Sequence, residues 1–244
     1  MRWLVGTVAA LRDETATART IVLDVPAWPG HVPGQHVDVR LTAADGYSAV
    51  RSYSIASAHS PQNRVELTVE RLRDGEVSPY LTQELAVGDP LELRGPIGGW
   101  FVWRTQEPEP VQLVAGGSGL VPLMAMIRAR AASGSTAPFR LLYSVREPAA
   151  ALYGDELRAQ ADRDHPVIVT YAYTRAVPEG SPDRPHRIDA ELIARAAWPA
   201  SASARCYVCG PTSFVESAAG LLTGAGYHSD TIRTERFGPT GDQR

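Results

Sequence analysis

The stretch Gln112-Leu-Val-Ala-Gly-Gly-Ser-Gly-Leu-Val-Pro122 decides the fold of the second half of the chain. Its apolar start predicts a short strand, its glycines a tight turn, and the apolar residues from about 121 to 131 a helix. Backbone N–H groups at a helix start lack intrahelical partners and point toward such a turn, where the helix dipole also favours negative charge. We therefore expect Gly117, Ser118 and Gly119 to bind a phosphate. The alternative is that these glycines only make a tight turn.

This turn departs from the dinucleotide fingerprint G-x-G-x-x-G. Gly117 and Gly119 fit the pattern, but Pro122 stands where the third glycine would be. Proline is tolerated in the first turn of a helix, because the N–H that it lacks has no intrahelical partner there. Pro122 is therefore compatible with the tight turn, but the missing third glycine indicates a nucleotide-binding family other than the one with the G-x-G-x-x-G fingerprint.

Beyond residue 110 the sequence alternates between apolar strands and helices. Strands are expected at 112–115, 139–145, 167–173, 205–209 and 231–237, and helices near 121–131, 152–162, 189–197 and 211–223. Alternation of this kind is typical of a parallel sheet with covering helices. We therefore predict a Rossmann-like α/β domain over residues 111–244.

Ahead of residue 105 the sequence consists of short β-segments separated by turn residues. Strands are expected at 20–25, 36–41, 49–56, 64–72 and 90–94. The apolar N-terminus predicts another strand rather than a signal peptide, because the charged run 12–14 follows it at once. This spacing predicts a small antiparallel barrel of Greek-key type over residues 1–104. The proline-rich segment Arg104–Pro110 is interpreted as the linker to the second domain.

Composition narrows the classes of function. With 44% hydrophobic residues the chain can bury a core, and a net charge of −3 argues against a nucleic-acid surface. The sequence contains no lysine, which excludes Schiff-base chemistry. No apolar run approaches the roughly 18 residues of a membrane span, so we expect a cytoplasmic protein.

Metal-ligating residues are few and scattered. The two cysteines, Cys206 and Cys209, are too few for a disulfide framework, a four-cysteine cluster or a zinc site. The six histidines show no ligand spacing, so no metal site is expected. Cys206 and Cys209 also fit a C-x-x-C redox pair, but positions three apart in a strand point to opposite faces, and a buried structural Cys206 is the simpler interpretation.

The segment Arg51-Ser52-Tyr53-Ser54 carries a second anion-binding pattern. On a strand, Arg51 and Tyr53 share one face. An arginine fork can hold a pyrophosphate while an adjacent aromatic ring stacks on a flat heterocycle. The alternative is an edge strand with an ordinary arginine and tyrosine on its solvent face.

This segment resembles the flavin-binding R-x-Y-S motif of the ferredoxin–NADP reductase family. Other segments resemble further family motifs in the same order: 75–78 (Gly-Glu-Val-Ser), 95–101 (Gly-Pro-Ile-Gly-Gly-Trp-Phe), 116–122, 209–211 (Cys-Gly-Pro) and 235–237 (Glu-Arg-Phe). The resemblance covers nearly the whole chain. It implies an FAD-binding barrel followed by an NAD(P)-binding domain.

For the first domain the resemblance assigns roles on β-segments. It implies that Arg51 contacts the FAD pyrophosphate, that Tyr53 stacks on the isoalloxazine and that Ser54 lies near flavin N5. Val69 and Arg71 would contact the flavin mainly through their backbone.

The resemblance also assigns a role to the turn before the predicted helix of this domain. Gly75 and Ser78 would bind the pyrophosphate. This agrees with a local prediction, because Ser78 is expected as the N-cap of a helix that begins with Pro79 and ends near Ala86.

For the second domain the resemblance places Cys209 beside the nicotinamide C4, with Gly210 and Pro211 in the same cofactor-binding motif. Ser54, Cys209 and Glu235 are the catalytic candidates. Phe237 matches the closing aromatic residue that shields the flavin. The tail from Gly238 to Arg244 extends beyond that residue.

Choice between the two nicotinamides is expected at the end of the strand 139–145. Ser144 and Arg146 are suited to a 2′-phosphate, whereas Glu147 is suited to a free 2′-hydroxyl. We expect NADPH rather than NADH, against the alternative that Arg146 is only a solvated surface residue.

The function implied by the resemblance is hydride transfer from NAD(P)H to FAD, followed by electron transfer to an acceptor. Relatives with a fused ferredoxin domain hold its cluster with cysteines that this sequence lacks. We therefore expect a separate acceptor, such as a ferredoxin or an oxygenase component. The alternatives are a regulatory subunit that binds flavin without turnover, and an NAD(P)H:flavin reductase that uses free flavin as substrate.

Overall fold

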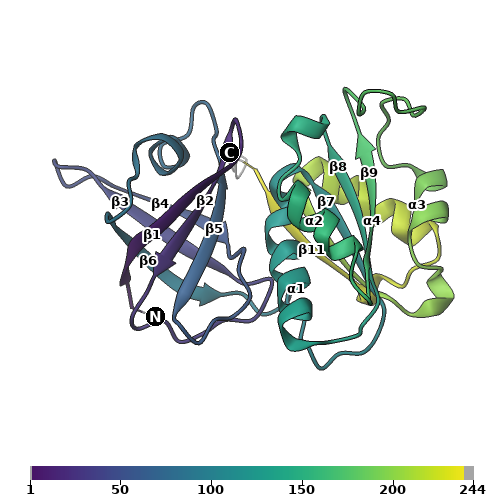
Figure 1. Cartoon of the computed structure of the whole chain (residues 1–244), viewed down its shortest axis with the longest axis horizontal. Helices are drawn as coiled ribbons and strands as arrows, with labels where there is room; N and C mark the ends of the chain where they lie inside the picture. Colours follow the sequence, from purple (N-terminus) through teal and green to yellow (C-terminus); the bar gives the residue numbers. More distant parts are fainter. Residues whose placement is uncertain (1, 239–244) are drawn as a thin grey trace, which may run out of the picture. The chain divides into compact units, whose positions relative to one another are not determined.

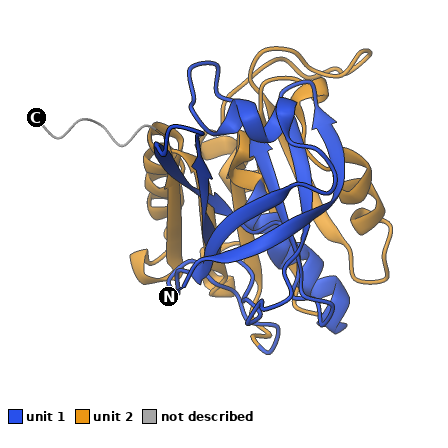
Figure 2. Cartoon of the chain, turned by 90° about the vertical axis from the view of Figure 1, so that its left-hand side faces the viewer, with its two compact units in different colours: residues 1–106, 121–135 blue, residues 107–120, 136–244 orange. Residues whose placement is uncertain are grey.

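A computed structural model describes residues 2–238 of the chain. These residues form two compact units (Figure 2). Unit 1 contains the residues up to 106 together with 121–135, and unit 2 contains 107–120 together with the residues from 136 onward.

Unit 1 is built on a six-stranded antiparallel sheet with the strand order β4-β3-β6-β1-β2-β5 (Figure 1). Its strands are β1 (Leu4–Thr15), β2 (Ala18–Asp24), β3 (His36–Thr42), β4 (Ser48–Ser54), β5 (Arg64–Glu70) and β6 (Pro90–Ile97). The two edges of the sheet meet just beyond β4, where Ile55 and Leu67 form an antiparallel bridge. The Ala56 N–H donates to the Glu66 carbonyl at 2.8 Å beside it. This closure confirms the predicted antiparallel barrel.

Strand β1 is longer than expected, because it continues through the charged residues Arg12, Asp13 and Glu14. Asp13 and Glu14 have partners on the neighbouring strand β2: the Arg19 guanidinium lies 2.7 Å from Asp13, and the Thr20 hydroxyl 2.7 Å from Glu14. Arg12 lies 2.9 Å from the Glu66 carboxylate. Cross-strand ion pairs and hydrogen bonds thus let a strand carry a charged run that resembles a loop in the sequence.

The helix predicted from Pro79 to Ala86 is shorter and has a different geometry. Helical backbone begins at Ser78, and Tyr80–Glu84 (η1) forms a π-helical turn in which the Leu85 N–H donates to the Tyr80 carbonyl at 3.0 Å. Ser78 is not the predicted N-cap, because its hydroxyl accepts the Leu72 N–H at 3.0 Å instead. The prediction was therefore right about the helix start and wrong about the cap and the length.

Unit 2 contains a five-stranded parallel sheet with the order β11-β10-β7-β8-β9. Its strands are β7 (Val111–Gly116), β8 (Phe139–Val145), β9 (Val167–Tyr173), β10 (Arg205–Pro211) and β11 (Ile232–Phe237). Helices α2 (Gly154–Ala161), α3 (Ala190–Ala196) and α4 (Thr212–Gly224) connect strands of this unit, together with the short turns η2 (Gly117–Gly119), η3 (Pro148–Ala150), η4 (Ala200–Ala202) and η5 (Ser229–Thr231). Every residue of β7 is buried, as expected for a parallel strand covered on both faces. The predicted α/β fold is confirmed.

Helix α1 (Leu120–Ser133) follows β7 in the sequence, but most of it belongs to unit 1. Arg128 of this helix donates to the Ala56 carbonyl at 3.0 Å and lies 3.1 Å from the Glu66 carboxylate. The two compact units are therefore not separated by one boundary in the linker, because residues 121–135 lie after the linker but belong to unit 1. The domain bounds 1–104 and 111–244 remain a prediction.

The helices within residues 2–238 are too short or too polar for any of them to span a bilayer.

Candidate functional site

Strand β4 places the R-x-Y-S residues of unit 1. Arg51 is exposed, Tyr53 is half-buried and packs against the hydrophobic core of the barrel, and Ser54 is buried. Burial raises the pKa of the Tyr53 phenol to about 12, so the ring is neutral at physiological pH. Tyr53 therefore offers a fixed, uncharged ring beside a cationic side chain, as a stacking role requires.

The loop from Arg71 to Ser78 forms a compact turn after β5, whose Val69 side chain is fully buried. The Arg71 N–H donates to the Thr17 carbonyl at 2.8 Å, and Ser78 anchors the other end through Leu72. A Cβ on Gly75 would lie 2.8 Å from the Ser78 hydroxyl oxygen. A side chain at position 75 would therefore require the Ser78 hydroxyl to move.

Arg51 already binds an anionic group from this loop. Its Nη2 lies 2.6 Å from Oε2 of Glu76, and the Tyr47 hydroxyl donates to Oε1 of the same carboxylate at 3.1 Å. The Glu76 carboxylate thus joins the Arg51 guanidinium to the turn 75–78, so the two groups that are expected to contact the FAD pyrophosphate lie together. These residues fit an FAD pyrophosphate. The sequence did not reveal the parts of Glu76 and Tyr47, because Glu76 is 25 residues from Arg51 along the chain.

In unit 2 the predicted residues meet at the carboxyl edge of the parallel sheet. Gly116 at the end of β7 pairs in register with Ser144 on β8. Cys209 on β10 pairs with Ala115 on one side and with Glu235 on the other. Ligands of open α/β sheets bind at this edge, so the register brings the residues predicted to bind the nicotinamide nucleotide together from separate strands.

The local backbone geometry explains why glycine stands at two positions of the turn 117–119. Gly117 has φ +55°, in the left-handed region that favours glycine. A Cβ on Gly119 would lie 2.1 Å from the Cys209 carbonyl oxygen. The tight-turn alternative therefore accounts for both glycines, and phosphate binding by Gly117, Ser118 and Gly119 remains a prediction.

Both cysteines are free and fully buried. Burial raises the pKa of the Cys206 thiol to about 12, and burial together with nearby Glu235 raises the pKa of Cys209 well above its usual range. Both thiols are therefore protonated at physiological pH. A protonated Cys209 matches a residue that lines a cofactor rather than a nucleophile.

Residues near the ends of β8 and β9 form the candidate 2′-phosphate position. Ser144 is buried, and Arg146 is exposed just beyond β8. The Arg175 N–H donates to the Arg146 carbonyl at 2.8 Å, which brings a second exposed arginine to the neighbouring strand end. Arg175 was not singled out from the sequence. The signal that could have found it is its position two residues beyond the strand predicted at 167–173.

Strand β11 carries Glu235 and ends at Phe237, which pairs in register with Pro211 next to Gly210. Arg236 lies 2.6 Å from the Glu216 carboxylate and fixes the end of this strand to α4. Of the C-terminal tail from Gly238 to Arg244, residues 239–244 lie outside the described residues.

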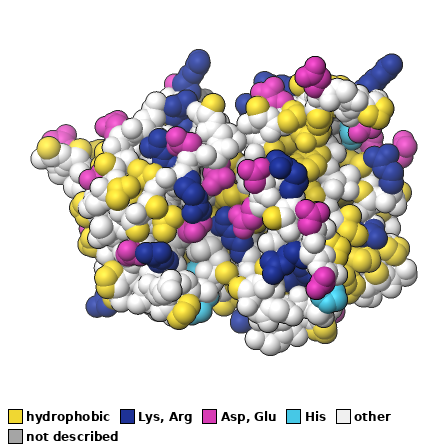
Figure 3. Space-filling view, in the orientation of Figure 1, with side chains coloured by type: hydrophobic (Ala, Val, Ile, Leu, Met, Phe, Trp, Pro, Cys, Tyr) yellow, Lys and Arg dark blue, Asp and Glu magenta, His cyan; other side chains and the backbone are white. Residues whose placement is uncertain are grey.

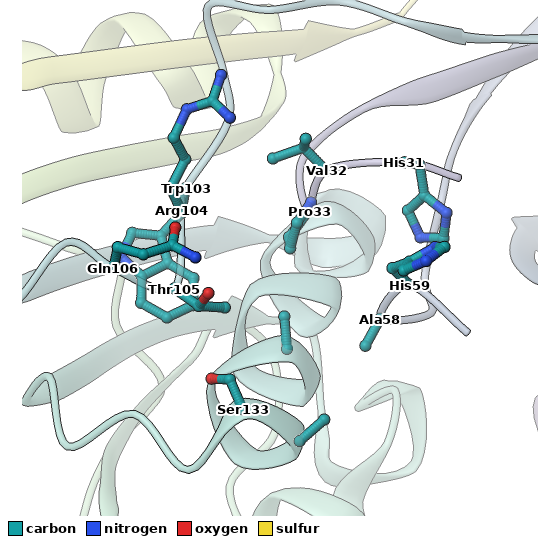
Figure 4. Close-up of a pocket in the computed structure, with 12 residues that line it drawn as sticks. His31, Val32, Pro33, Ala58, His59, Trp103, Arg104, Thr105, Gln106 and Ser133 are labelled. Carbon is teal, nitrogen blue, oxygen red and sulfur yellow. The ribbon is translucent and has the colours of Figure 1, made fainter. Parts of the chain in front are cut away.

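A pocket of about 410 Å³ lies elsewhere in unit 1 (Figure 4). His31 and His59 form one side of it, and Trp103, Gln106 and Ser133 line other parts. The His31 ring is already engaged on both nitrogens, by the Trp28 indole at 3.1 Å and the Ser57 carbonyl at 2.9 Å. The pocket shares no lining residue with the predicted site. Within residues 2–238 no group of three or more His, Cys, Asp or Glu residues is placed to hold a metal ion.

Acidic and basic side chains are interspersed on the face shown in Figure 3. Neither sign forms a continuous patch there.

Comparisons with known proteins identify the family of each half of the chain. Residues 13–102 match the oxidoreductase FAD-binding domain family, and residues 113–220 match the oxidoreductase NAD-binding domain family. The first match includes the turn 75–78, and the second includes the turn 117–119. FAD and NAD(P) are therefore the cofactors of this fold.

Curated relatives match over nearly the whole chain. The ferredoxin–NAD(P)+ reductase component of the naphthalene 1,2-dioxygenase/salicylate 5-hydroxylase systems of Ralstonia sp is 30% identical over 97% of this chain and 69% of its own length. The glycine betaine monooxygenase reductase subunit of Chromohalobacter salexigens is 29% identical over 93% of this chain and 62% of its own length. The chain spans about two thirds of the length of the curated relatives that it matches.

Solved structures share the fold. The flavohem-like FAD/NAD-binding domain of nitric oxide dioxygenase from Vibrio cholerae has a TM-score of 0.85 at 24% identity, with 97% of this chain and 99% of that chain covered. The cytochrome P450 reductase of Amycolatopsis has a TM-score of 0.84 at 24% identity, with 98% and 70% covered. Taken with the 30% identity to a reductase component, these findings show that the chain belongs to the ferredoxin–NADP reductase family of FAD- and NAD-binding oxidoreductases.

Proposed function

We propose that this chain transfers electrons from NAD(P)H through FAD to a separate acceptor protein. Bound FAD supplies the redox chemistry, because a flavin accepts two electrons as a hydride and releases them singly. The chain supplies binding and alignment of the two cofactors.

The observation that carries the proposal is that one chain matches both an FAD-binding and an NAD-binding domain family, each with a turn that is expected to bind a phosphate. In unit 1, Arg51 meets the turn 75–78, where the Glu76 carboxylate joins the two. In unit 2, the turn 117–119 lies beside Cys209 at the carboxyl edge of the sheet. One site for each dinucleotide is what an enzyme that passes electrons from NAD(P)H to FAD requires.

Individual residues take these roles in the proposal. Arg51, Gly75 and Ser78 bind the FAD pyrophosphate, Tyr53 stacks on the isoalloxazine, and Ser54 hydrogen-bonds near flavin N5. Val69 and Arg71 contact the flavin through backbone, and Phe237 shields it. Gly117, Ser118, Gly119, Gly210 and Pro211 bind the nicotinamide nucleotide, while Cys209 and Glu235 line the position of its reacting ring.

The acceptor lies outside these 244 residues. Two cysteines cannot hold a four-cysteine iron–sulfur cluster, so electrons that leave FAD must go to another site. Relatives are reductase components of dioxygenase and monooxygenase systems. A ferredoxin or an oxygenase component is the acceptor class that these relatives support.

NADPH is the proposed electron donor. Arg146 and Arg175 are both exposed and joined through their backbones at neighbouring strand ends. Two guanidinium groups favour a 2′-phosphate over a 2′-hydroxyl, because arginine binds phosphate with charge-assisted hydrogen bonds. A cytoplasmic location is also proposed, since it supplies the soluble nicotinamide that the reaction consumes. Recovery of the protein with a membrane fraction would contradict that location.

The test is steady-state oxidation of NADPH by the purified full chain with different acceptors. The proposed function predicts a yellow protein that reduces a ferredoxin or an oxygenase component. Colourless protein that turns over only added flavin would instead identify a flavin reductase. Yellow protein that oxidises neither NADPH nor NADH with any acceptor would identify a flavin-binding regulatory subunit.

A further inference from the structure

The Glu76 carboxylate binds the Arg51 guanidinium, which in the proposed function binds the FAD pyrophosphate. We propose that Glu76 is a built-in competitor of FAD, whose carboxylate holds Arg51 when flavin is absent and must leave it when the pyrophosphate binds. The inference rests on the proposed function and adds the group that opposes flavin binding.

The first support is the atom of Arg51 that Glu76 engages. Glu76 Oε2 lies 2.6 Å from Nη2, while Nη1 donates to the Val50 carbonyl at 2.8 Å. A guanidinium binds an oxyanion through two neighbouring nitrogens, either Nε with Nη2 or Nη1 with Nη2. Both arrangements include Nη2. A phosphate in either fork is therefore brought next to the Glu76 carboxylate, and like charges at that distance repel.

A second support is that the carboxylate is held from two directions. Tyr47, in the turn between β3 and β4, donates its hydroxyl to Oε1 at 3.1 Å while Arg51 engages Oε2. Each oxygen of Glu76 thus has its own partner. The Glu76 carboxylate is therefore held beside Arg51 by two hydrogen bonds.

Exposure makes this competitor displaceable. The Arg51 and Glu76 side chains keep 52% and 51% of their surface in solvent. Ion pairs that exposed are weak, because water and salt screen them. Glu76 can therefore turn into solvent when a stronger anion arrives, and the cost appears as weaker FAD binding rather than as a block.

The experiment measures FAD affinity of the flavin-free full chain by quenching of flavin fluorescence. Glu76→Gln keeps the side-chain shape and removes the charge. It should lower the FAD dissociation constant about 2- to 5-fold, the factor that an exposed ion pair supplies. Tyr47→Phe should lower it less, because it loosens Glu76 without removing the charge.

The matched control is Glu84→Gln, which removes the same charge from an exposed residue of η1. It should leave the FAD dissociation constant unchanged. Equal tightening by both variants would mean a general charge effect and would overturn the competitor role. Unchanged or weaker binding by Glu76→Gln, with an unaltered far-UV circular dichroism spectrum, would also overturn it while leaving the proposed function intact. If wild type and variants all fail to quench flavin fluorescence, the proposed function itself fails.

Discussion

Gly119 packs directly against the backbone of Cys209: a Cβ on Gly119 would lie 2.1 Å from the Cys209 carbonyl oxygen and 2.4 Å from its carbonyl carbon. Backbone atoms of a central parallel strand cannot move away as a flexible side chain can. The turn after β7 can therefore pack against the end of β10 only because residue 119 has no side chain.

Gly119→Ala should therefore separate the turn from β10. We expect a loss of about 1–3 kcal/mol in the free energy of unfolding, the usual cost of overpacking, and weaker NAD(P)H binding. Urea denaturation and nicotinamide titration measure the two effects. Gly220→Ala is the control, because nothing lies within 4 Å of a Cβ at this exposed position of α4. Alanine there should be neutral or stabilising. Equal changes in unfolding free energy and NAD(P)H affinity in the two variants would show that close packing at Gly119 is not required.

Removal of the Tyr53 ring should weaken FAD binding. Tyr53→Ala loses a half-buried ring, and aromatic stacking is worth roughly 1–3 kcal/mol, so the FAD dissociation constant should rise about 5- to 150-fold. Tyr53→Phe keeps the ring and should bind FAD nearly as well. Flavin occupancy measured from the visible spectrum of purified protein decides this. Undiminished occupancy in Tyr53→Ala would show that the ring does not stack.

Stability should fall in mild acid because of His31. Burial is the largest cause that lowers the His31 pKa from 6.5. Since the Trp28 indole can only donate, the His31 Nδ1 accepts and Nε2 carries the proton that bonds to the Ser57 carbonyl. The unfolded chain therefore binds the extra proton more readily. His31 contributes stability above pH 6.5 that is lost as pH falls through its lowered folded pKa.

His31→Gln tests this contribution, because the glutamine amide offers one acceptor and one donor and does not titrate. The fall in thermal midpoint between about pH 7.5 and pH 5.5 should be smaller in this variant than in wild type. His36, whose pKa burial also lowers, titrates in both proteins, so the difference between them isolates His31. Identical pH profiles would contradict the assignment.

Arg146 and Arg175 should set the choice of nicotinamide. Arg146→Ala and Arg175→Ala should each raise KM for NADPH about 10-fold, as expected for loss of a charge-assisted hydrogen bond, with little change for NADH. Arg158→Ala is the matched control, since its side chain is 78% exposed on α2. A parallel rise for both nicotinamides would mean that these arginines do not read the 2′-phosphate.

Sequence patterns predicted the parallel sheet well for a physical reason. Strands β8 and β9 begin and end at the residues expected, 139–145 and 167–173. Both strands are rich in apolar, β-branched and aromatic residues, and charged residues follow them within two positions, which marks their ends in the sequence. The tight glycine turn after β7 followed from the same local signals, whereas phosphate binding there remains a prediction.

Features that depend on distant partners were not predictable in this way. The extension of β1 through residues 12–14 relies on Arg19, Thr20 and Glu66, and the hydroxyl of Ser78 turns to Leu72 rather than to the helix. The pairing of Glu76 with Arg51 joins a loop to a strand. Local propensity carries no information about such contacts, because only the folded chain brings the partners together.

Anaerobic titration of the yellow, purified protein with NADPH and, in parallel, with NADH tests whether the chain passes a hydride from nicotinamide to FAD. We expect the visible flavin band to bleach with about one equivalent of NADPH, because one hydride reduces one FAD. A flavin that stays oxidised with excess of either nicotinamide would contradict it.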